Sequence, residues 1–191
     1  MTNLAIALML ALQSALPGVG QDRLRVVSED MVSVVNNEFT NGELKSNIKQ
    51  EDALTMLAAV AVGESALRRD VEDCKVAGDG GRSVGLGQVM RGPNWKGYKR
   101  SEICGNRKLQ LKLALHVLDA CWQRSPDATS AFRCYTSGDP RKSSYVARHE
   151  FSTYKRMRSH VKRGVESQHI LTCSLSGLSS FYVREINICE L

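Results

Sequence analysis

This sequence lacks several short motifs that by themselves indicate a class of reaction. It has no phosphate-binding loop, no Gly-x-Ser-x-Gly turn and no His-Glu-x-x-His helix. None of its six cysteines forms a Cys-x-x-Cys pair, so we expect neither a zinc site nor any other cofactor. Its four histidines are scattered, and His116, on a mostly apolar segment, is expected to be a satisfied core residue. Function must therefore be sought among the carboxylates.

Long apolar runs and repeats are also scarce. The longest run, residues 4–16, is too short to span a bilayer comfortably. It resembles the apolar part of a secretion signal, but no Lys or Arg precedes it. A signal, a membrane anchor and an amphipathic or core helix all stay open for this run.

The composition fits one soluble domain with extensions, because 42% of the 191 residues are hydrophobic and 24% are charged. A net charge of +6 favours anionic partners: nucleic acid, a membrane surface or an acidic cell-wall polymer. An even number of cysteines suggests disulfides and an oxidising destination. Six buried free thiols are the alternative.

Apolar spacing predicts a mainly α fold. Helices are expected from residue 51 to Glu64 and over 108–124, 127–135 and 143–163, the last with a basic outer side. Short apolar stretches predict one more helix that ends near residues 36–37. Residues 74–106 are rich in glycine and predict loops that wrap a cleft, and 170–191 predict a short strand pair or an ordered extension.

Glu64 is the leading candidate for chemistry. It continues the apolar phase of its helix, and apolar surroundings raise the pKa of a carboxyl enough to make it a proton donor near neutral pH. The alternative is a helix-end Glu that caps the helix or pairs with Arg68. Downstream, Ser83 and Gly85 allow a tight backbone turn, and Gln88 adds an amide for sugar hydroxyls or N-acetyl groups.

Two of these segments resemble the first two motifs of the soluble lytic transglycosylase family, whose members share a lysozyme-like fold. The first is Glu64-Ser65 and the second is 83–90, Ser-Val-Gly-Leu-Gly-Gln-Val-Met. Family members usually read Gly-Leu-Met-Gln in the second motif, and Gly87 stands here in place of the Met. The resemblance covers roughly residues 52–160.

Two further family motifs have partial matches. Residues 134–138, Cys-Tyr-Thr-Ser-Gly, resemble Ala-Tyr-Asn-Ala-Gly, with Thr136 where Asn is usual. The fourth motif supplies a tyrosine from the next helix, and Tyr145, which precedes Val, matches it better than Tyr154. Without the resemblance, Tyr135 is equally a helix-packing aromatic with a satisfied hydroxyl.

The resemblance implies a lysozyme-like domain over 51–163, with a Gly-rich flap at its cleft, between an extension (1–50) and a tail (164–191). The implied reaction is cleavage of the peptidoglycan β-1,4 bond between muramic acid and glucosamine, with formation of 1,6-anhydromuramic ends. Glu64 would be the acid and base. The implied substrate-binding residues are Ser65, Ser83, Gly85, Gln88, Tyr135 and Tyr145.

The implied fold also brings cysteines together. Cys74 and Cys104 would join the two ends of the flap region, and Cys121 and Cys134 would join successive helices. Cys173 and Cys189 would form a third pair.

Three other functions stay open. A hydrolase needs a second carboxylate, and the candidates are Asp70, Glu72, Asp73 and Asp79. Of these, Asp79 is flanked by glycines that make its position hard to fix, and no acid lies between residues 80 and 98. An inactive structural component of a virion or secretion machine is the second. A nucleic-acid-binding protein is the third, from the basic residues of 141–163, although a solvated helix face explains them better.

The destination is expected to be a phage virion or the bacterial periplasm and envelope. Three features favour the virion: a Met1 that has not been removed, the absence of basic residues before the apolar run, and flanks that lack the family resemblance.

Overall fold

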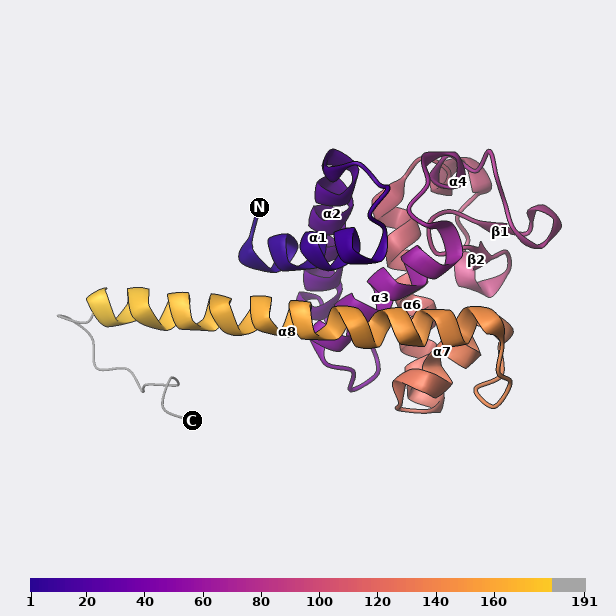
Figure 1. Ribbon diagram of the computed structural model, residues 1–191. Coiled ribbons are helices and arrows are strands. Elements are labelled where there is room, and N and C mark those ends of the chain that lie inside the picture. The colour runs from indigo at the N-terminus through magenta and orange to yellow at the C-terminus, as the bar shows by residue number, and fades with distance from the viewer. Residues whose placement is uncertain (180–191) are drawn as a thin grey trace.

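The computed structural model describes the backbone of residues 1–179 and the side chains of residues 1–163. Over this range the protein is mainly helical, as the sequence predicts (Figure 1). The α-helices are α1 (Asn3–Ala15), α2 (Gln21–Thr40), α3 (Gln50–Ser65), α4 (Arg69–Glu72), α5 (Arg100–Ile103), α6 (Arg107–Arg124), α7 (Ala128–Ser137) and α8 (Tyr145–Ser179). Two 3₁₀ turns, η1 (Asp79–Gly81) and η2 (Pro93–Trp95), flank a hairpin of β1 (Ser83–Val84) and β2 (Val89–Met90).

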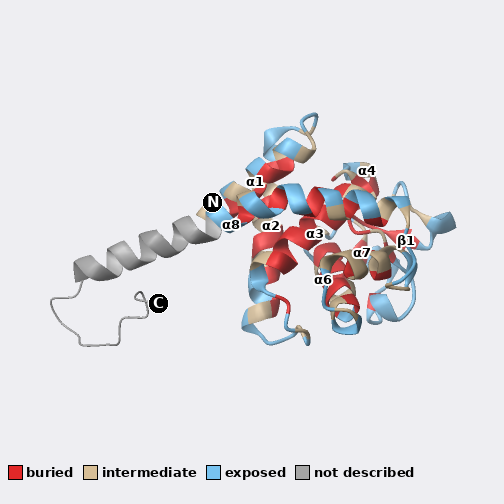
Figure 2. Ribbon diagram, turned by 60° about the horizontal axis from the view of Figure 1, so that its bottom comes forward, coloured by how far each residue is buried: buried red, intermediate tan, exposed pale blue. Residues whose placement is uncertain are grey.

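Helix α3 lies at the centre of the molecule (Figure 2). Every residue from Asp52 to Val62 is buried, and α1, α2, α6 and α8 all pack against it. A helix that is apolar on all sides is typical of a protein interior. Because Glu64 follows directly in the last turn, the core holds the carboxyl-bearing end of α3 in place.

The first fifty residues share this core. The apolar run 4–16 forms α1, whose Leu8 and Leu12 are fully buried, and α1 packs on α2 and α8. Among the described residues, no helix has the length and apolar character needed to cross a membrane.

The glycine-rich segment forms the hairpin. Its strands pair antiparallel, with Ser83 opposite Met90 and Val84 opposite Val89. Gly85 takes a φ of +76°, and a Cβ there would lie 2.6 Å from the side chain of Gln110. Gln110 accepts from the Leu86 amide and donates to the carbonyls of Glu72 and Ile103. The buried side-chain amide of Gln110, on α6, therefore fixes the hairpin turn.

Two disulfides have the predicted pairing. Cys74 is bonded to Cys104, at the two ends of the hairpin segment, and Cys121 is bonded to Cys134, between α6 and α7. Such bridges are typical of proteins in an oxidising environment, such as the periplasm or the cell exterior. The third predicted pair, Cys173–Cys189, lies outside the described side chains.

One boundary prediction is wrong, and one of the two alternatives for the tail, the strand pair, does not hold over residues 170–179. Helix α2 does not end near residues 36–37 but continues to Thr40, because Phe39 packs against the core and extends the apolar face by a turn. Residues 170–179 are not a strand, since α8 continues through Ser179. The remainder of the tail, 180–191, lies outside the described residues.

Candidate functional site

Glu64 stands in the last turn of α3. The helix ends directly after it, because Ala66 and Leu67 take left-handed backbone angles (φ of 49° and 58°). The Ser65 hydroxyl stabilises this end: it donates to the Ala61 carbonyl at 2.7 Å and accepts from the Leu67 amide at 3.2 Å. Ser65 therefore fixes the end of the helix that carries Glu64. Arg68, the alternative partner of Glu64, instead pairs with Asp70 at 2.6 Å.

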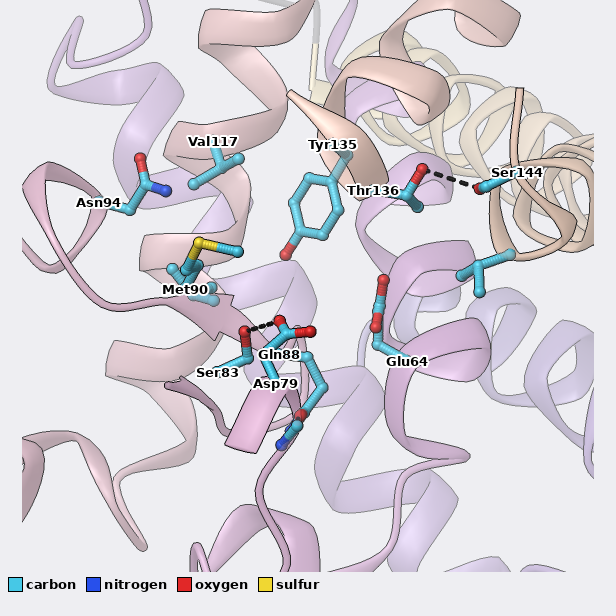
Figure 3. Close-up of a pocket in the computed structure, with 13 residues that line it drawn as sticks. Glu64, Asp79, Ser83, Gln88, Met90, Asn94, Val117, Tyr135, Thr136 and Ser144 are labelled. Atoms are coloured by element: carbon cyan, nitrogen blue, oxygen red, sulfur yellow. Dashed lines mark hydrogen bonds between the residues drawn. The ribbon is translucent and has the colours of Figure 1, made fainter. Parts of the chain in front are cut away.

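The side chain of Glu64 faces a pocket of about 270 Å³ (Figure 3). Figure 3 shows Glu64 on one side, Asp79 and Ser83 on the opposite side, and Tyr135 and Thr136 beside Glu64. The lining is mostly polar and comes from α3, η1, the hairpin, η2, α6, α7 and the start of α8. Its polar members are Glu64, Asp79, Ser83, Gln88, Asn94, Tyr135, Thr136 and Ser144.

A second hollow of about 320 Å³ adjoins the first. The two share Glu64, Gly78 and Gln88 in their linings. The second hollow is more apolar, since Val62, Val71 and other aliphatic residues line it. Glu64 thus stands where two hollows meet, so an extended ligand could place one unit on each side of the carboxyl.

Tyr135 is placed by Gly87. Its hydroxyl donates to the Gly87 carbonyl at 2.6 Å. A Cβ on Gly87 would lie 2.8 Å from that hydroxyl and 2.6 Å from Cβ of Ala114. Glycine at this position therefore has a physical reason, because only glycine lets α6 and Tyr135 approach so closely. Burial, with the nearby charges of Glu64 and Glu150, raises the pKa of Tyr135 well above its usual value, so the hydroxyl stays a donor.

Gln88 serves the backbone of the hairpin. Its Oε1 accepts from the Gly78 amide at 2.7 Å, and its Nε2 donates to the Gly85 carbonyl at 2.9 Å. Both polar ends of the amide are engaged, so Gln88 shapes the wall between the two hollows. Thr136 bonds to Ser144 at 3.1 Å and to the Phe132 carbonyl at 3.1 Å, which joins α7 to the start of α8.

Asp79 is fixed more firmly than its flanking glycines predict. The Ser83 hydroxyl donates to Oδ2 of Asp79 at 2.5 Å, across the start of the hairpin. The expectation that Asp79 would be hard to position is therefore wrong. The other candidate carboxylates lie away from the pocket, because Asp70 pairs with Arg68, Asp73 with Lys75, and Glu72 with two arginines.

The prediction that Tyr145 contacts a ligand is not supported by its position. Its side chain is 74% exposed, stacks on His149 and does not line the pocket, although both of its sequence neighbours do. Tyr154, the alternative, is buried in the helix packing and donates to Asp52 at 2.8 Å. His116 is a satisfied core residue as predicted, with Nε2 2.6 Å from Glu38.

Sequence reasoning missed Glu150, on α8. Its side chain is fully buried, and a Cβ on Gly63 would lie 2.7 Å from its Cγ. The signal was present in the sequence: Ala147, Tyr154, Met157 and Val161 mark the buried face of α8, and Glu150 falls in the same helical phase. An acid inside an apolar stripe is rare enough to single out.

The carboxyl of Glu150 lies against the backbone next to Glu64, since a Cβ on Gly63 would lie 3.3 Å from Oε1 of Glu150. The two acids therefore influence each other's protonation. Burial raises the pKa of Glu64 to about 7, against a lowering by the hydrogen bond from Glu150 and with a further rise from the charge of Asp79. The pKa of Glu150 is raised more than that of Glu64, to about 10. Burial is the largest cause, followed by the charge of Glu64 and the interaction of the two carboxyl groups. Glu64 can therefore hold a proton near neutral pH.

Comparisons with family models, curated proteins and solved structures find no match. The site must therefore be interpreted from its own residues. Within the described part of the chain, no group of three or more His, Cys, Asp or Glu side chains is arranged as a metal site. The chemistry that the arrangement offers is proton transfer by carboxyl groups.

Proposed function

We propose that this protein is a peptidoglycan lytic transglycosylase of lysozyme-like fold, with Glu64 as its catalytic acid and base and the hairpin segment as the flap. The observation that carries the proposal is the setting of Glu64: a carboxyl with a pKa of about 7 at the meeting point of two hollows. The matches at 64–65 and 83–90 to the family motifs supply the substrate class.

In the proposed reaction the Glu64 carboxyl acts first as an acid and then as a base. Protonated Glu64 donates its proton to the oxygen between the two sugars, and the bond from that oxygen to the anomeric carbon of the muramic acid breaks. The 6-hydroxyl of the same muramic acid then attacks its anomeric carbon, and its proton passes to the Glu64 carboxylate. Because the nucleophile belongs to the substrate, the attack is intramolecular and no second protein carboxylate is required.

The groove suits a polymer. With the scissile oxygen at Glu64, one sugar lies in the polar hollow beside Asn94 and Thr136, and its neighbour lies in the more apolar hollow beside Val71. A net charge of +6 favours an anionic wall polymer over long range.

Hydrolysis is the second candidate, and one observation favours it. Asp79 faces Glu64 across the pocket, and Ser83 holds its carboxylate in place. A carboxylate so placed could activate a water on the far face of the sugar, as an inverting glycosidase requires. The protein would then be a lysozyme, with reducing ends as its product.

The remaining alternatives have weaker support. An inactive component of a virion or secretion machine has no need of a buried acid with a raised pKa at the junction of two hollows. For nucleic-acid binding, the basic face of 141–163 is partly engaged within the protein, since Arg141 pairs with Asp139 and Arg158 with Asp52. A phage virion or the periplasm remains the proposed place of action.

Loss of turbidity of purified peptidoglycan is the direct test. The wild-type protein should clear the suspension, and Glu64→Gln should not. If the wild type leaves the suspension turbid but shifts DNA in a salt-dependent manner, the nucleic-acid alternative replaces the enzyme.

A further inference from the structure

Glu150 is the buried titratable group that the proposed reaction leaves unused. Its side chain is fully buried, and neither carboxyl oxygen accepts a hydrogen bond from any donor among the described residues. None of the salt bridges between described residues includes it. A charged carboxylate in such a place would lack every form of compensation.

The titratable groups that interact with Glu150 among the described residues are themselves acids. Glu64 acts on it from α3 and Tyr135 from α7. Across the pocket, the charge of Asp79 raises the pKa of Glu64. Two neighbouring ionised carboxylates repel each other, and neither can donate. Their contact becomes favourable when one of the two is protonated.

The two acids differ in their access to solvent. Glu64 is the more accessible member of the pair, since it lines both hollows, whereas Glu150 lines neither. The charge is therefore less costly on Glu64, where ligand or water can reach it, and the proton is better kept on Glu150.

We propose that Glu150 is a neutral carboxylic acid that donates a hydrogen bond to the carboxylate of Glu64 and so stabilises the form of Glu64 left after proton donation. Glu150 is thus a positioning residue, since it acts through Glu64 and does not touch the substrate. Gly63 is part of the arrangement, because any side chain there would displace Glu150. The catalytic consequence rests on the proposed function, whereas the protonation state does not.

The pair Glu150→Gln and Glu150→Leu separates this role from packing. Gln keeps a donor at the same place, whereas Leu fills the volume without one. With Leu, the Glu64 carboxylate loses a charged hydrogen bond, so cleavage of purified peptidoglycan should fall by about tenfold to a hundredfold. The pKa of Glu64 should rise, and the basic limb of the kcat/KM profile should move to higher pH. Gln should restore most of the rate and the profile.

The protonation state has its own readout. At about pH 8, above the pKa of Glu64, infrared spectra should show a protonated carboxyl band in the wild type that Glu150→Gln removes. The absence of that band would overturn the proposal, whether or not peptidoglycan is cleaved. So would a Gln variant as impaired as the Leu variant, or one whose basic limb moves to lower pH. If the band is present but the protein cleaves no peptidoglycan, the proposed enzymatic function is wrong, whereas the protonated state of Glu150 is supported.

Discussion

Two buried acids of this protein, Glu72 and Glu150, have opposite surroundings. Glu72 lies between α2 and α6, where Arg23 (2.5 Å) and Arg107 (3.3 Å) pair with its carboxylate. Glu150 lies between α3 and α8, where its nearest titratable partner is another acid. The first arrangement compensates a buried charge, and the second prevents one from forming.

The difference separates a structural acid from a functional one. A compensated acid such as Glu72 holds segments together, here α4 with α2 and α6. An uncompensated pair lowers stability, and proteins tolerate such a cost chiefly where the chemistry requires it. Substitutions at these acids and their neighbours test this contrast.

Removal of the Glu64 carboxyl should have the largest effect. Glu64→Gln keeps the shape of the side chain but cannot donate the proton, so the lysis rate should fall by about a hundredfold or more. The melting temperature should hold or rise, because a buried acid has been removed. Asp22→Asn, at a fully exposed carboxyl on α2, is the matched control and should retain full activity. If the Glu64→Gln variant still lyses peptidoglycan at the wild-type rate, Glu64 is not the catalytic residue.

The compensated acid should respond in the opposite way. Glu72→Gln leaves Arg23 and Arg107 without their buried counter-charge, so the free energy of unfolding should fall by about 3 kcal/mol or more. The activity of the molecules that remain folded should change little. Denaturant titration, with lysis measured well below the transition, checks both statements. A stable but inactive variant would contradict the division of roles.

The uncompensated pair should make stability depend on pH. The pKa of Glu64 is about 7 in the folded protein and about 4.5 in the unfolded chain, so the folded state binds more protons between these values. The contribution of Glu64 to the free energy of unfolding is therefore fully present below about pH 4.5 and is lost as the pH rises through 7. In Glu64→Gln/Glu150→Gln this decline should be absent. An identical slope in both proteins, measured by denaturant titration at several pH values, would argue against the pair.

A single methyl group should disturb the pair without removing either acid. In Gly63→Ala the new Cβ would lie 2.7 Å from Cγ of Glu150, so Glu150 must move away from Glu64. Lysis should fall by about tenfold, as expected for the loss of one charged hydrogen bond. Gly18→Ala, where a Cβ meets nothing within 4 Å, is the control. Equal activity of both variants would show that the close contact does not matter.

The smallest effect is expected at Asp79. In a transglycosylase the attacking hydroxyl belongs to the substrate, so Asp79→Asn should change the rate little. In a lysozyme the same change removes the group that activates water and should impair lysis strongly. Turbidity assays of this variant beside the wild type distinguish the two.

The sequence predicts the parts of this molecule that depend on local pattern. The periodicity before Glu64 locates α3, and Asp127 caps α7 through the Ser130 amide near the predicted helix start. Both disulfides also follow from the expected fold. The apolar phase of α8 marks Glu150 as a buried acid, but its pairing with Glu64 joins two helices far apart in the chain, and a single sequence does not show which helix faces meet.

Two other side chains lie where the local sequence does not place them, for the same reason. Tyr145 matches a motif, yet its exposure depends on how α8 begins, which the motif does not encode. Asp79 looked mobile because of its glycine neighbours, whereas its hydrogen bond to Ser83 forms only when η1 meets the hairpin. Local composition thus predicted the elements, while contacts between elements decided the roles of the side chains.

Mass spectrometry of muropeptides from a peptidoglycan digest identifies the product and with it the reaction. We expect 1,6-anhydromuramic ends in the wild-type digest and none with Glu64→Gln, because Glu64 both delivers the proton and accepts it from the 6-hydroxyl. Products heavier by one water, with reducing ends, would show that water is the nucleophile and would make the protein a lysozyme. A wild-type digest that contains only intact glycan would contradict the assignment of an enzyme.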